Sequence, residues 1–71
     1  MSRNWEIVPE MKLADGNATE WRLMIVKGIF YWIDSMSDGT FNVIGPDGHT
    51  VLMNCKSLAS AKRWVRIHLY G

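Results

Sequence analysis

The sequence predicts a small α+β domain, in which an antiparallel meander of three to four strands carries one carboxy-terminal helix on one face. Three observations predict this fold. Two apolar segments flank a Lys-Gly pair, turns containing Gly and Asp separate two further short apolar segments, and the last residues show helical spacing. The 71 residues allow one domain, with an irregular amino-terminal segment (residues 1–20), strands (21–54) and a helix (57–69).

A tight β-hairpin is the first predicted element. The segments "WRLMIV" (21–26) and "IFYWI" (29–33) are rich in β-branched and aromatic residues, which favour strands. Lys27-Gly28 between them is typical of a two-residue turn, because Gly adopts positive φ readily. The motifs "SDG" (37–39) and "GPDG" (45–48) predict further turns, so "TFNVI" (40–44) and "HTVLMN" (49–54) are the next strands.

The amino-terminal segment is predicted to be less regular. "NWEIV" alternates and is compatible with an edge strand, but Pro9 interrupts the alternation. We expect Trp5 to pack on the domain and the segment from Pro9 to Glu20 to be mobile or irregular.

The closing segment is predicted to be a helix capped by Ser57. Four apolar side chains at spacings of three and four should face the sheet: Leu58, Ala61, Val65 and Leu69. Trp64 and His68 flank this face on one side and Lys62 on the other, while Arg63, Arg66, Ile67 and Tyr70 point mainly away.

Composition indicates a soluble cytoplasmic protein that does not enter a membrane. Cys55 is the only cysteine, whereas small secreted domains usually carry several disulfides. No segment resembles a signal peptide or is long enough to span a bilayer. Because 48% of the residues are hydrophobic, the apolar surface exceeds what a small core hides, which suggests a protein partner or a homodimer.

No residues have the spacing of a catalytic or metal site, so we predict a non-enzymatic protein without cofactor or metal. His49 and His68 are isolated from other ligand types. Cys55 is expected to be a small buried residue, although the helix start next to it can change thiol acidity. Asp34, Asp38 and Asp47 do not match a calcium loop and are interpreted as turn residues.

The helix is the most basic part of the chain. Residues 56–71 hold four basic and no acidic side chains, whereas residues 1–55 hold four basic and seven acidic ones. This asymmetry fits a solvated helix face, a protein-binding surface of Arg63, Arg66, Ile67 and Tyr70, or binding to nucleic acid. The net charge of +1 favours the first two.

The second candidate surface is the sheet face that the helix leaves open. Phe30 and Trp32 should share this face, because side chains alternate along a strand. Trp5 of the amino-terminal arm, a second copy of the chain or a stacked base would each cover it. The candidate partner-binding residues are therefore Lys62, Arg63, Arg66, Ile67, Tyr70, Phe30 and Trp32.

The segment "CKSLASAKRW" follows a strand and a Gly-bearing turn, and it places Ser57 at the cap and Ala61 close to the sheet. Here the chain resembles small bacterial and phage-type domains of three strands followed by one helix. It is similar to the DNA-binding domains of plant ethylene-response factors and of some phage integrase amino termini. Those domains contact DNA through Arg and Trp on the strands, and this chain offers Trp21, Arg22 and Trp32 among mostly apolar strand residues.

Together these features predict a non-enzymatic protein-interaction module, of the kind that phages and other mobile elements make to bind or inhibit a host protein. The alternative is a small DNA-binding domain that uses the basic helix, through Lys56, Lys62, Arg63 and Arg66.

Overall fold

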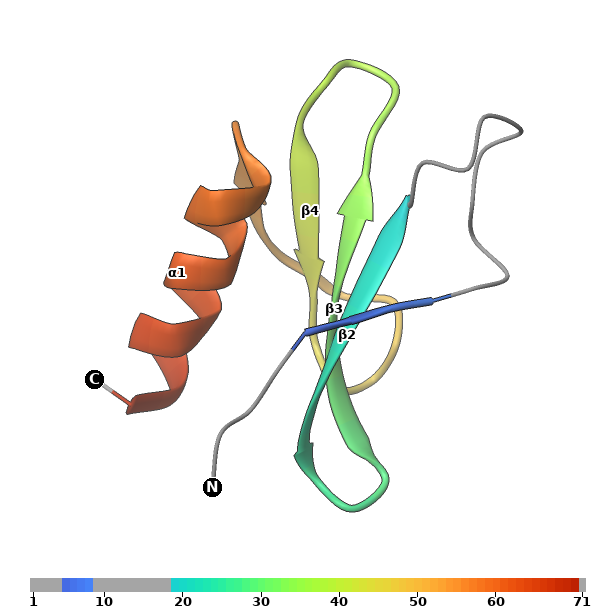
Figure 1. The fold of residues 1–71 in the computed structure, drawn as a ribbon, viewed down its shortest axis with the longest axis vertical. Coiled ribbons are helices and arrows are strands. Elements are labelled where there is room, and N and C mark those ends of the chain that lie inside the picture. The colour runs from blue at the N-terminus through green and yellow to red at the C-terminus, as the bar shows by residue number, and fades with distance from the viewer. Residues whose placement is uncertain (1–4, 9–18, 71) are drawn as a thin grey trace.

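Each strand of the sheet pairs with its neighbour in the sequence. The computed structural model describes residues 5–8 and 19–70. Its strands lie in the order β1-β2-β3-β4-β5, and every pair is antiparallel. The elements are β1 (Glu6–Ile7), β2 (Glu20–Val26), β3 (Ile29–Ser35), β4 (Phe41–Ile44), β5 (Val51–Cys55) and α1 (Leu58–Tyr70). Figure 1 shows α1 standing beside one face of this sheet, which confirms the predicted α+β fold.

The sheet has five strands where the sequence predicts three to four, because the amino-terminal segment adds β1. Glu6 lies opposite Arg22 and Ile7 opposite Trp21, and the Val8 N–H donates to the Glu20 carbonyl at 3.0 Å. Strand β2 begins at Glu20, inside the segment that was expected to be irregular. Residues 9–18 of that segment lie outside the described residues.

The turns follow the predicted chemistry. Gly28 joins β2 to β3 with φ of 83°, and Gly48 has the same φ between β4 and β5. Both conformations favour Gly, which lacks the Cβ that restricts other residues in this region. The Asp47 carboxylate accepts from the backbone N–H groups of His49 at 3.0 Å and Thr50 at 2.9 Å, which fixes the second turn.

The core lies between α1 and the sheet. Ile33 and Val43 from the sheet and Ala61 and Val65 from the helix are fully buried, with 0% exposure. Leu58 and Leu69 pack against this cluster from both ends of the helix, so the predicted helix face is the observed one. The Ser57 hydroxyl accepts from the Ser60 N–H at 3.0 Å and caps the first turn as predicted.

The helix is offset across the sheet. It packs mainly on β3, β4 and β5, at the carboxy-terminal side of the strand order. Strands β1 and β2 therefore lie beside this main contact, although Leu23 of β2 still belongs to the shared core. This offset positions the site described next.

Candidate binding groove

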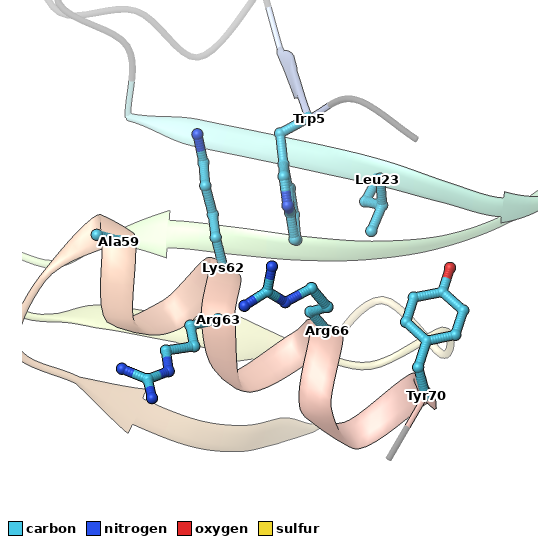
Figure 2. Close-up of a pocket in the computed structure, with 7 residues that line it drawn as sticks. All are labelled: Trp5, Leu23, Ala59, Lys62, Arg63, Arg66 and Tyr70. Atoms are coloured by element: carbon cyan, nitrogen blue, oxygen red, sulfur yellow. The ribbon is translucent and has the colours of Figure 1, made fainter. Parts of the chain in front are cut away.

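A groove separates one side of α1 from β2 and the residue before β1, and we call it the basic groove. It has a volume of about 790 Å³. The helix supplies most of its lining, and Trp5 and Leu23 come from the amino-terminal side (Figure 2). The lining residues are Trp5, Leu23, Ala59, Lys62, Arg63, Arg66 and Tyr70.

Helical spacing explains the polar wall of the groove. Lys62, Arg66 and Tyr70 are four residues apart, so they lie one above the other on the same side of α1. Figure 2 shows Lys62 extending toward β2 and Arg66 turned toward Trp5, whereas Arg63 points away from them. Lys62 is half-buried and Arg66 is exposed. Two cationic groups therefore face the groove and a third lies at its margin.

The apolar part of the groove comes from three different segments. Leu23 is buried at 6% exposure as part of the core cluster, and Trp5 packs against that cluster while remaining partly exposed. Ala59 adds a small side chain on the helix. The groove thus combines cations with an apolar surface, and no acidic side chain is among its described lining residues.

The alternation of β1 keeps a carboxylate away from this site. Glu6 follows Trp5, and successive residues of an extended segment direct their side chains to opposite faces. The Glu6 carboxylate lies 3.6 Å from Nε of Arg22, its cross-strand neighbour. Trp5 therefore lies on the helix side of the sheet, so the alternative in which it covers the open face is wrong.

The open face presents the other two aromatic candidates. The rings of Phe30 and Trp32 are tilted, with centroids 5.8 Å apart, and the Arg22 guanidinium lies 5.5 Å from the centroid of the Phe30 ring. Both aromatic side chains are half-buried. Arg22 is also paired with Glu6, so this face presents a partly neutralised cation.

The structure thus divides the sequence-predicted residues among three places. Lys62, Arg63, Arg66 and Tyr70 come together in the basic groove. Ile67 lies on the other side of α1, in a second groove that we call the β5 groove. Phe30 and Trp32 lie on the open sheet face. Sequence reasoning missed Trp5, Leu23 and Ala59 as groove residues; the alternation of Trp5 with Glu6 was the available signal for Trp5.

His68 and Cys55 are engaged in packing, whereas His49 lies exposed in a turn. His68 stacks on Trp64 with ring centroids 4.8 Å apart and planes 11° apart. His49 is exposed, and its Nδ1 lies 3.7 Å from the Asp47 carboxylate. Cys55 is buried, and burial raises the pKa of its thiol, because the thiolate is poorly solvated there.

The carboxylates of Asp38 and Asp47 bind groups of their own turns, whereas Asp34, for which a turn is also predicted, lies within β3. Hydrogen bonds from the Thr40 side chain and then from its backbone lower the pKa of Asp38. The corresponding bonds from Thr50, followed by that from the His49 N–H, lower the pKa of Asp47 to about 2. Both groups are therefore ionised turn residues above pH 4, by the ordinary titration range of Asp.

The described residues form neither a metal-ion cluster nor a membrane-spanning helix. Across residues 5–8 and 19–70, no three His, Cys, Asp or Glu side chains gather in a way that could hold a metal ion. In the same part of the chain, no helix has the length and apolar character needed to cross a membrane. Comparison of the chain with protein-family models, with curated proteins and with solved structures gives no match.

Proposed function

We propose that this chain is a non-enzymatic protein-interaction module that binds an acidic segment of a partner protein in the basic groove. One observation carries the proposal: Lys62 and Arg66 face an apolar surface of Trp5 and Leu23, in a groove whose described lining holds no acid. In keeping with the sequence hypothesis, the proposed setting is the reducing cytosol and the proposed role that of a phage-type accessory protein.

The groove chemistry defines the ligand. The Arg66 guanidinium can bind a carboxylate through two parallel N–H donors, and Lys62 adds a compact positive charge on the same wall. An apolar side chain next to those carboxylates would leave water by packing on Trp5, Leu23 and Ala59. The volume of about 790 Å³ lies within the usual range of ligand pockets, about 300–1,000 Å³. A short segment with acidic residues on either side of one large apolar residue fits these features.

A protein ligand fits the groove better than nucleic acid does. Proteins that bind single strands combine stacking aromatics with a positive groove that follows several phosphates. Here Arg63 points away from Lys62 and Arg66, and the lining also includes the aliphatic side chains of Leu23 and Ala59. The net charge of +1 also gives little long-range attraction to a polyanion.

Fluorescence anisotropy with a labelled peptide tests the proposal. The probe is a peptide in which a central Phe is flanked by Glu residues, and the matched probe carries Gln in place of Glu. We expect saturable binding of the acidic peptide only, weakened about tenfold or more by Lys62→Glu or Arg66→Glu, as for a central interface residue. Lys27→Glu, in the exposed hairpin turn far along the chain from α1, is the charge-matched control and should bind normally.

Oligonucleotides of equal net charge are run beside the peptides. Binding of single-stranded or duplex DNA with a steep salt dependence, and no binding of the acidic peptide, would establish the DNA-binding alternative. Equal binding of the Glu and Gln peptides, or equal loss in Lys27→Glu, would refute the groove as an acidic-peptide site. Far-UV circular dichroism should show that Arg63→Glu and Arg66→Glu fold normally, because both side chains are exposed.

A further inference from the structure

The edge strand β5 presents an unusual run of exposed apolar residues. Val51, Leu52 and Met53 are consecutive and are 50%, 37% and 43% exposed. In the described strand order β5 pairs only with β4, so its outer edge offers unpaired backbone groups. Natural edge strands are commonly protected by Lys or Pro, and Val51–Cys55 contains neither. The opposite edge, β1, is only two residues long and carries Glu6.

Apolar surface continues from this edge onto the helix. The β5 groove, of about 490 Å³, runs along the junction of β5 and α1. Met53 from the strand and Trp64 and Ile67 from the helix supply its main apolar lining. Ile67 is 54% exposed, whereas Val65, two residues before it, is fully buried. An occupant that pairs with β5 would therefore also bury side chains of α1.

We infer that β5 pairs antiparallel with β5 of a second copy of this chain, about a two-fold axis at Met53. Met53 is the middle residue of Val51–Cys55, so this register aligns the two strands along their full length. Antiparallel pairing about such an axis keeps the same face of both sheets on the same side. The two α1 helices then lie on one side of a continuous sheet, and Met53 and Ile67 of both copies meet between them.

Charge complementarity favours a second copy as the occupant. With Met53 opposite Met53, Lys56 of each copy lies across from Thr50 of the other. The backbone N–H and hydroxyl of Thr50 both donate to the Asp47 carboxylate, so each Lys56 comes next to a fixed negative charge. The same segment of the chain thus carries both the cation and the anion, and the two-fold axis brings the Lys56 of each copy to the Asp47 of the other. The two Lys56 side chains lie at opposite ends of the ladder and do not repel each other.

We expect a weak, concentration-dependent dimer. The ladder between β4 and β5 shifts register near Val43 and Ile44, and such irregularities increase strand twist. The area buried by pairing one short strand and filling one groove is also small compared with the roughly 800 Å² per partner of a standard interface. Dissociation on dilution is therefore part of the inference.

Analytical ultracentrifugation of the full chain tests the inference. We expect the mass of two chains at about 0.1–1 mM and of one chain on dilution, in the range of weak association. Met53→Lys should give a monomer throughout, and Met24→Lys should dimerise like the unmodified chain. Met24 is the matched control, since it is an exposed methionine (49%) on β2. A monomer at about 1 mM would overturn the inference, as would loss of the dimer in Met24→Lys and not in Met53→Lys.

Cross-linking tests the register and does not require that the Met53→Lys variant folds. In a Cys55→Ala background, Met53→Cys should form a disulfide-linked dimer under mild oxidation. Directly opposed residues in an antiparallel pair have Cα atoms about 4.5–5.5 Å apart, within the range that a disulfide spans. Met24→Cys in the same background should remain uncross-linked. Equal cross-linking of both variants would mean random collision and would contradict the proposed register.

Discussion

The Asp47 carboxylate accepts hydrogen bonds from both the backbone N–H of Thr50, at 2.9 Å, and the Thr50 hydroxyl. These bonds hold the turn between β4 and β5, and they favour the ionised carboxylate. They lower the pKa of Asp47 from 3.8 to about 2.

This depressed pKa predicts how stability depends on pH. An Asp whose folded pKa lies below its unfolded pKa stabilises the fold above the unfolded value, and that contribution is lost as the pH falls through the folded value. For Asp47 the window runs from 3.8 down to about 2. Urea unfolding of the unmodified chain should therefore show a falling free energy of unfolding across this window.

Asp47→Asn is the variant that isolates this effect, and Asp38→Asn is a second test of it, because Asp38 also has a lowered pKa. Each variant should show a shallower loss between pH 4 and pH 2 than the unmodified chain, by linkage to one missing carboxyl group. A carbon-detected NMR titration of Asp47 gives the midpoint directly. A midpoint near 4, the ordinary Asp value, would contradict the prediction.

Ala61 and Ala59 test how closely α1 lies on the sheet. Ala61 is fully buried with 0% exposure, and Ala59 is exposed two residues away on the same helix. Ala61→Leu should lower the free energy of unfolding by about 1–3 kcal/mol through overpacking. Ala59→Leu should change it by less than about 0.5 kcal/mol, as a typical surface substitution does. Urea titrations of both variants measure the difference in the free energy of unfolding. Equal destabilisation by both substitutions would contradict the assignment of Ala61 to the buried face of α1.

Ile33 and Ile29 test where the core ends along β3. Ile33 is fully buried, whereas Ile29 is 44% exposed at the start of the strand. Ile33→Ala should cost about 2–5 kcal/mol, from lost burial and the cavity left behind. Ile29→Ala should cost less than half as much in the same thermal or urea unfolding measurement. A larger loss at Ile29 would show that the hairpin end of the sheet is covered in solution.

Cys55 should react slowly with thiol reagents in the folded protein. Burial raises the pKa of its thiol, so little thiolate forms near neutral pH, and the side chain is only 8% exposed. Reaction with a chromogenic disulfide at pH 8 should accelerate strongly when urea unfolds the chain. A rate that equals that of an unfolded control at every urea concentration would contradict the buried position.

Local chemistry explains which parts of the fold the sequence predicts correctly. The turn at Gly28 and the cap at Ser57 depend on neighbouring residues alone, so a short stretch of sequence contains all the relevant information. The packed helix face follows in the same way from the spacing of Ala61 and Val65. Strand β1 depends instead on Glu6 and Ile7 meeting Arg22 and Trp21 across the intervening residues, which no local pattern specifies.

The candidate site was only half predictable for the same reason. Helical spacing alone groups Lys62 and Arg66 on one side of the helix. The groove itself requires α1 to lie over β3, β4 and β5, and that offset results from how side chains of both layers fit. The position of Trp5 further depends on the register of β1, and a shift of one residue would move it to the other face.

The sequential strand order also bears on how the chain reaches its folded state. From β2 onward every strand pairs with the one just before it, and α1 packs on the strands nearest to it in sequence. Few distant segments must find each other, so the loss of chain entropy before the first stabilising pairings is small. Domains with such local contacts fold faster than β-proteins built from distant pairings. We therefore expect this sheet to assemble rapidly by successive addition of hairpins, with docking of α1 on β3 as its least local step.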